Sequence, residues 1–145
     1  PLNTFQANDL YPMSVVAADF TSDGVPDVVT ANIGRNTLSL MASTDDGLLA
    51  DPKELGGGAN PFPLVAGDLN GDCRPDLVTG NAYSEVWVLM GLGAGRFQTE
   101  QRFQVDARPG ALALADMNRD GKLDIVGVRG QANEVFVLYS MTASP

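Results

Sequence analysis

The chain has 145 residues, 44% of them hydrophobic, and a formal net charge of −9 from 18 acidic and nine basic residues. This composition is that of a folded globular chain with one ordinary core, and an acidic balance without a basic stripe argues against nucleic acid as a partner. The absence of histidine excludes histidine-based triads and histidine zinc ligands, and the single Cys73 cannot form an internal disulfide.

No apolar run approaches the roughly 20 residues that span a bilayer, so no membrane span is expected. The chain begins with Pro1, not with methionine, and shows no signal peptide. These features predict a mature or excised segment.

Three acidic nonapeptides recur along the chain. They read DFTSDGVPD, DLNGDCRPD and DMNRDGKLD, at Asp19–Asp27, Asp68–Asp76 and Asp116–Asp124. Each has aspartate at its first, fifth and ninth positions and an oxygen-bearing residue at its third. The first aspartate recurs after 49 and then 48 residues, a regular spacing that predicts a repeat architecture.

Short apolar segments surround each acidic loop in the same order. One segment precedes the loop, at Ser14–Phe20, Leu64–Leu69 and Ala111–Met117. A second follows it directly, at Asp27–Ala31, Asp76–Gly80 and Asp124–Val128. A third comes after a polar turn, at Thr37–Met41, Val86–Met90 and Val135–Tyr139. Segments of this length, rich in β-branched residues, predict strands, and the compact loops between them favour antiparallel pairing.

A fourth, more polar strand is expected in the first two repeats, at Leu48–Leu55 and at Phe97–Val105. The second of these follows a glycine-rich turn at Gly91–Gly95. The third repeat ends without such a segment. At the amino terminus, Thr4–Gln6 resembles Arg96–Gln98 and is a candidate replacement.

Four antiparallel strands in every 48 to 49 residues predict an all-β fold made of β-propeller blades. The expected repeats span approximately residues 12–60, 61–108 and 109–145, with residues 1–11 as an outer strand of a neighbouring blade. Because known propellers use about four to eight blades, three cannot close a ring. The chain is therefore expected to be a fragment of a longer propeller or to form a homo-oligomer, in which the Phe5 strand completes a neighbour's third blade.

The acidic loops predict up to three calcium ions, because calcium takes six to eight oxygen ligands. Oxygen-only ligands disfavour zinc, copper and iron, and the number of ligands favours calcium over magnesium. An EF-hand is excluded, since the twelfth loop positions carry no glutamate and strand formers follow. The expected ligands are side-chain oxygens at positions one, three, five and nine and the carbonyl at position seven: Asp19, Thr21, Asp23, Val25 and Asp27; Asp68, Asn70, Asp72, Arg74 and Asp76; Asp116, Asn118, Asp120, Lys122 and Asp124.

The third loop is expected to bind most tightly. Gly121 permits a positive φ at its bend, whereas Cys73 replaces that glycine in the second loop. In the first loop, Thr21 offers a hydroxyl where the other loops offer an amide carbonyl. The alternative interpretation is that these residues only form Asx-type turns, but such turns do not require aspartate at three fixed positions in three repeats.

Two other features have structural explanations. Trp87 could stack on a sugar, but aligned apolar residues at Leu38 and Phe136 favour a role in the core between blades. The glycines at 91, 93 and 95 lack the strand–loop–helix context of a phosphate-binding loop.

The pattern resembles the FG-GAP/VCBS repeat family, which includes the head of integrin α-subunits. The residues that carry the resemblance are Asp68–Val78, Asp116–Val126 and the glycine-rich turn with Phe97. The resemblance implies propeller blades whose calcium loops join the first two strands. It also implies extracellular adhesion, carbohydrate binding or protein docking, sometimes beside polysaccharide-degrading domains.

Two functions are consistent with these features. The first is a non-enzymatic, extracellular or secreted module that binds a glycan or protein ligand, with structural calcium. The second is part of a polysaccharide-degrading enzyme, such as a lyase. Lyase chemistry needs a base beside an acidic sugar, and the only lysines are Lys53 and Lys122, so binding is the favoured function.

Overall fold

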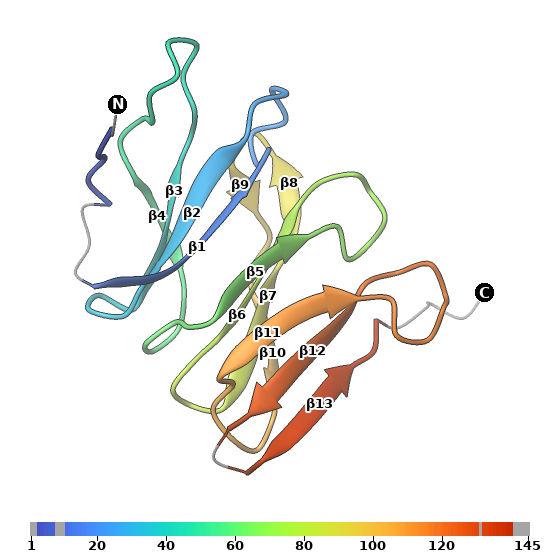
Figure 1. Ribbon diagram of the computed structural model, residues 1–145. Helices are drawn as coiled ribbons and strands as arrows, with labels where there is room; N and C mark the ends of the chain where they lie inside the picture. Colours follow the sequence, from blue (N-terminus) through green and yellow to red (C-terminus); the bar gives the residue numbers. More distant parts are fainter. Residues whose placement is uncertain (1–2, 8–10, 131, 141–145) are drawn as a thin grey trace.

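The computed structural model describes residues 3–7, 11–130 and 132–140. Its secondary structure in these residues consists of strands, which form three antiparallel sheets and one small hairpin (Figure 1). No helix in the described residues is long and apolar enough to cross a membrane. The predicted all-β fold of blade-like sheets is confirmed.

The sheets follow one another along the chain. The first sheet has the order β1 (Pro12–Ala18), β2 (Asp27–Asn32), β3 (Thr37–Met41) and β4 (Lys53–Gly56). The second has the order β5 (Leu64–Gly67), β6 (Asp76–Gly80), β7 (Glu85–Leu89) and β10 (Gln101–Gln104). The third contains β11 (Ala111–Ala115), β12 (Asp124–Arg129) and β13 (Glu134–Leu138). The hairpin pairs β8 (Gly91–Gly93) with β9 (Arg96–Phe97).

The predicted bounds of the fourth strands are wrong. In the first repeat, a bridge between Ser43 and Leu49 closes a separate turn, and the outer strand begins only at Lys53. In the second repeat, Phe97 belongs to the β8–β9 hairpin, and the outer strand is β10. The glycine-rich turn at Gly91–Gly95 includes β8 and forms the bend of that hairpin. Gly93 and Gly95 adopt positive φ values of 71° and 63°, which allow the chain to reverse its direction tightly.

Strand pairing also corrects the alignment of Trp87. Trp87 lies opposite Thr79, Phe136 opposite Gly127, and Ser39 opposite Thr30. The residue equivalent to Trp87 in the first sheet is therefore Ser39, and the predicted equivalence with Leu38 is wrong by one position. The error arises because the middle repeat has one residue fewer between its ninth aspartate and this position. Trp87 is buried, so its predicted role in the core is confirmed.

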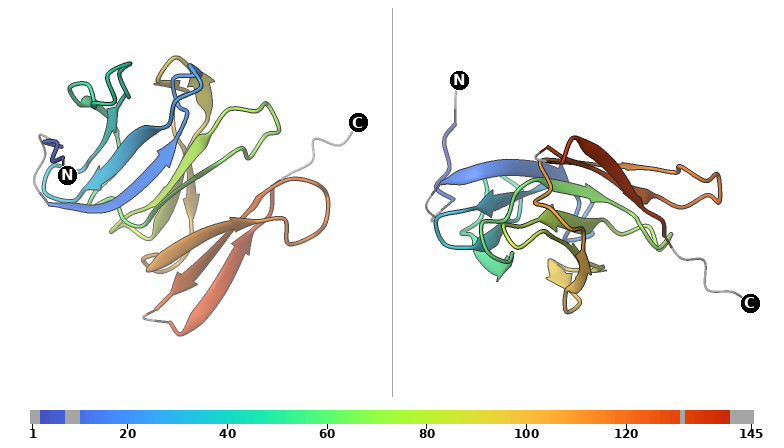
Figure 2. Two further views of the ribbon diagram at one scale, coloured as in Figure 1. Left: turned by 45° about the horizontal axis from the view of Figure 1, so that its top comes forward. Right: turned by 90° about the horizontal axis from the view of Figure 1, so that it is seen from below.

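Two apolar cores separate the three sheets. Leu38 and Leu40 of the first sheet pack with Trp87 and Leu89 of the second. Val86 of the second sheet, which points to its opposite side, belongs to the core shared with the third sheet. The first strands of the sheets, β1, β5 and β11, contact one another in succession. Figure 2 shows the sheets side by side, an arrangement that buries the middle one on both faces.

Candidate metal centre

Each acidic loop connects the first strand of a sheet to the second. The loops follow β1, β5 and β11. In Figure 1 they emerge at the same end of the three sheets. In each loop the fifth aspartate is exposed and the ninth is buried, so the loop reaches from solvent to the core.

The ninth aspartate fastens its loop to the end of the third strand. Asp76 is fully buried; its Oδ2 accepts a hydrogen bond of 2.8 Å from the Leu69 amide, and its Oδ1 accepts one of 2.7 Å from the Gly91 amide. Bonds of 2.8 to 2.9 Å connect Asp27 with the amides of Thr21 and Ser43, and Asp124 with those of Met117 and Ser140. This carboxylate therefore has a structural role in every repeat, whether or not it also binds a cation.

Burial and hydrogen bonding act in opposite directions on these carboxylates. Burial raises the pKa of Asp76, and the amides of Gly91 and Leu69 only partly offset it. Burial also acts to raise the pKa of Asp124, but hydrogen bonds from Ser140 and Met117 outweigh it, so this pKa lies below its usual value. The part of the stability that depends on the ionisation of Asp76 is therefore lost as the pH rises through its raised pKa, whereas the part that depends on Asp124 is lost as the pH falls through its lowered pKa. A cation beside Asp76 would favour its charged form.

The second and third loops have the same internal hydrogen bonds. Asp116 Oδ1 accepts from the amides of Arg119 (2.6 Å) and Asp120 (3.1 Å), and its Oδ2 accepts from Gly121 (2.9 Å). Asp68 accepts from the amides of Gly71 (2.7 Å), Asp72 (3.1 Å) and Cys73 (2.8 Å) in the same way. In the first loop Asp19 accepts from the amides of Asp23 (3.1 Å) and Gly24 (2.8 Å).

The fifth and seventh positions have the same relation in all three loops. The seventh amide donates to Oδ1 of the fifth aspartate, from Val25 to Asp23 (2.8 Å), from Arg74 to Asp72 (2.9 Å) and from Lys122 to Asp120 (2.9 Å). These contacts fix the backbone beside the carbonyl that is predicted to be a ligand. Whether these carbonyls and carboxylates bind a cation stays a prediction.

Each loop turns at two positions with left-handed backbone. The predicted bend at position six is confirmed, with φ values of 90°, 63° and 86° at Gly24, Cys73 and Gly121. The sequence interpretation missed the bend at position four, where Ser22, Gly71 and Arg119 have φ values of 62°, 79° and 65°. Every loop thus places one glycine and one other residue in this region. Backbone strain therefore gives no reason for the second loop to bind a cation more weakly than the third.

The left-handed Cys73 gives a direct test of this strain. Cys73→Gly is expected to stabilise the chain by about 1 kcal/mol, because a side chain in this conformation costs about 1–2 kcal/mol and glycine entropy returns part of it. Cys73 is exposed, so its side chain contributes little packing. Denaturant unfolding in EDTA measures the effect. Gly121→Cys is the matched control and should destabilise by a similar amount; stabilisation by both changes would contradict this account.

The residues present suit a hard cation. The predicted side-chain donors are carboxylate, amide and hydroxyl oxygens, and each ionised carboxylate has about four lone-pair sites. Thr21 Oγ1 is buried without a hydrogen-bond partner in the structure. As they stand, no three carboxylates of the described residues converge closely enough to hold a metal ion.

The β8–β9 hairpin covers the first acidic loop, a contact that sequence reasoning missed. The amides of Ala94 and Gly95 donate to the carbonyls of Thr21 (2.9 Å) and Phe20 (3.0 Å). The rings of Phe20 and Phe97 lie 5.9 Å apart. The glycine-rich segment was the sequence feature that pointed to a close contact here. The structure gives the reason for glycine at one position, because a Cβ on Gly93 would lie 2.9 Å from Ser22 Oγ.

Lys53, one of the two lysines considered as a base, takes part in this contact between repeats. Its Nζ donates a 2.9 Å hydrogen bond to the Gly95 carbonyl. The bond ties the outer strand of the first sheet to the hairpin of the second. This is a structural role for the ammonium group.

Comparison with known families agrees with the repeats seen in the structure. A family of FG-GAP-like repeats matches residues 19–79 and 68–127, and both matches begin at the first aspartate of an acidic loop. A search among curated proteins found no match. The two family matches together cover most of the chain and contain all three loops, so the chain belongs to the FG-GAP-like repeat family.

Proposed function

We propose that this chain is a calcium-binding, β-propeller-type module that binds a glycan or protein ligand outside the cell. The observation that carries the proposal is the repetition of one acidic loop at the same end of three sheets, with the same contact between its fifth and seventh residues. An Asx turn alone does not require three aspartates in each loop.

Calcium is the cation that suits these loops best. Loading three divalent ions would change the formal charge from −9 to −3. Like-charged carboxylates in one loop repel one another, and a cation bound between them would remove this repulsion. Weak calcium sites of extracellular modules bind at about 10⁻⁴–10⁻³ M, and FG-GAP repeats are typical of extracellular or surface proteins.

The role proposed for the metal is structural. The ninth aspartate of each loop is hydrogen-bonded to the second residue after the third strand. A cation that orders the exposed part of the loop therefore also fixes the end of the sheet. The loops would then present a rigid surface at one end of the sheets, where a ligand can bind without having to order them.

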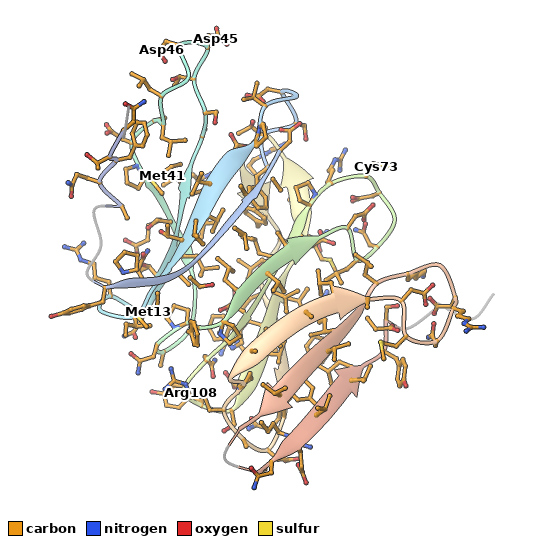
Figure 3. The ribbon with its side chains drawn as sticks, viewed as in Figure 1. Met13, Met41, Asp45, Asp46, Cys73 and Arg108 are labelled. Atoms are coloured by element: carbon orange, nitrogen blue, oxygen red, sulfur yellow. The ribbon has the colours of Figure 1, made fainter. Side chains whose placement is uncertain are left out.

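Calcium titration by calorimetry tests this proposal. We expect up to three sites in the unmodified chain and one fewer in each of Asp23→Ala, Asp72→Ala and Asp120→Ala. Asp45, which lies at the exposed tip of the β3–β4 connection (Figure 3), supplies the matched control, because Asp45→Ala removes a carboxylate outside the loops. Equal binding by all four variants would overturn the proposal. A glycan array with and without calcium then tests the ligand class.

A further inference from the structure

The second and third acidic loops have nearly the same conformation but differ at their fourth position. The second loop has Gly71 there and the third has Arg119, and both residues have left-handed backbone, with φ values of 79° and 65°. The residues before them, Asn70 and Asn118, are both exposed. Figure 3 shows the second loop, in which Cys73 is labelled, projecting from the end of the sheets. The chain thus presents an asparagine in the same setting twice, once before glycine and once before arginine.

Asn70 is the one asparagine in the sequence that a glycine follows. A side-chain amide can lose ammonia when the backbone nitrogen of the next residue attacks its carbonyl carbon. Glycine permits this attack best, because it has no side chain to obstruct the approach and its backbone reaches conformations that other residues avoid. The pair Asn70–Gly71 therefore places a labile amide in an exposed loop.

The reaction needs only water and a base from the solvent. The Gly71 backbone nitrogen gives up its proton and forms a bond to Cγ of Asn70, the bond from Cγ to Nδ2 breaks, and the side-chain nitrogen takes up a proton and leaves as ammonia. Water then opens the cyclic imide at either carbonyl carbon, which gives aspartate or isoaspartate at this position. Nothing is oxidised or reduced, and the formal charge of the chain changes from −9 to −10.

Hydrogen bonds of the loop hold both groups that must react. The Gly71 amide donates a 2.7 Å bond to Asp68 Oδ1. The Asn70 side chain is bound to Asp72 in two ways, since its Oδ1 accepts from the backbone amide at 2.9 Å and its Nδ2 donates to Oδ2 at 3.1 Å. The nitrogen and the side-chain amide must leave these partners before they can meet. The reaction therefore requires the loop to open, and exposed loops open locally at low cost.

The third loop holds Asn118 in the same way. Its Oδ1 accepts from the Asp120 amide at 2.9 Å, and its Nδ2 donates to Asp120 Oδ2 at 3.1 Å. The Arg119 amide donates a 2.6 Å bond to Asp116 Oδ1. Opening either loop breaks the same set of bonds, so the residue at the fourth position is the main difference between the two asparagines.

We propose that Asn70 is a site of spontaneous deamidation, restrained by the hydrogen bonds of the second acidic loop. The product loosens that loop, because a carboxylate at this position cannot donate to Asp72 and repels it. Isoaspartate also adds a methylene group to the backbone before Gly71, which displaces the Gly71 amide from Asp68. The reaction has no counterpart at Thr21 in the first loop and does not depend on calcium.

Incubation of the full chain in mildly alkaline buffer with EDTA tests the proposal, with deamidation measured by peptide mapping and mass spectrometry. We expect the folded chain to lose the amide of Asn70 roughly tenfold or more faster than that of Asn118, since glycine leaves the backbone nitrogen open to reaction. Unfolding the chain in urea should speed the loss at Asn70 by about tenfold or more, because the loop bonds are then absent. Equal rates at the two asparagines, or equal rates at Asn70 in the folded and unfolded chain, would overturn the proposal.

Exchanging the fourth residues of the two loops should move the site. Gly71→Arg should protect Asn70, and Arg119→Gly should make Asn118 about as labile as Asn70 is in the unmodified chain. The loops can accept both changes, because a Cβ on Gly71 would have no neighbour within 4 Å and Arg119 already has the left-handed conformation. Circular dichroism checks that each variant is folded. A labile amide that stays at Asn70 after both exchanges would overturn the proposal.

The restraint by the loop has its own matched pair of variants. Asp68→Ala removes the acceptor of the Gly71 amide and should speed the loss at Asn70 by roughly fivefold, as expected when one hydrogen bond no longer holds the nitrogen. Asp116→Ala makes the same change in the third loop and should leave the rate at Asn70 unaltered. No effect of Asp68→Ala, or an equal effect of both, would overturn the proposed restraint.

Discussion

Replacing Asp76 with alanine is expected to lower the free energy of unfolding by about 1–4 kcal/mol, even without any metal. The substitution leaves the amides of Leu69 and Gly91 without their acceptor, at a cost of about 1–3 kcal/mol for each buried group. Relief of the carboxylate's own burial offsets part of this cost, since burial raises the pKa of Asp76. Denaturant unfolding in EDTA is the measurement.

The matched control for this prediction is Asp72→Ala in the same loop. Asp72 is exposed, and its carboxylate accepts hydrogen bonds within the loop from the Arg74 amide (2.9 Å) and Asn70 Nδ2 (3.1 Å). Without metal, its removal should change the stability by no more than about 1 kcal/mol. Equal destabilisation by both substitutions in EDTA would contradict the structural role of the ninth aspartate.

The first three strands of each repeat could be predicted because their sequences carry strong local signals. Their β-branched and apolar residues stand directly before and after the acidic loops or follow a short polar turn, and the bounds of β3 and β6 match the predicted segments. The outer strands β4 and β10 are short, polar and largely exposed. Pairing with β3 and β7 defines them, and such long-range pairing leaves no periodic pattern in the sequence.

In the candidate site, too, the features with a local sequence signal could be predicted, and those that depend on long-range contacts could not. The spacing of aspartates predicted the three loops, and glycine predicted the bend at Gly121. Nothing in the residue type marked the left-handed conformation of Arg119, since arginine rarely adopts it. The bonds from the ninth aspartates to Ser43, Gly91 and Ser140 span 15 to 16 residues. They depend on where the third strand ends, which only the folded structure defines.

Adding 10 mM calcium is expected to stabilise the chain more than any single substitution does. Sites with dissociation constants of about 10⁻⁴–10⁻³ M contribute about 1.4–2.7 kcal/mol each at this concentration, or about 4–8 kcal/mol for three. For a chain of this size the midpoint of thermal unfolding should rise by about 10–25 °C. Differential scanning calorimetry in EDTA and in calcium measures the shift.

Screening of the loop carboxylates by salt is the alternative explanation of such a shift, and two controls separate it from binding. Magnesium at the same concentration screens equally well but demands six close ligands in octahedral geometry, so its effect should be much smaller. A variant with alanine at Asp23, Asp72 and Asp120 keeps the three buried aspartates and should lose most of the calcium effect. Equal shifts from calcium, magnesium and sodium chloride of matched ionic strength would mean that the loops are solvated acidic turns that do not bind calcium specifically. A shift specific to calcium and abolished in the triple variant would instead identify the exposed carboxylates as ligands, because screening does not distinguish calcium from magnesium.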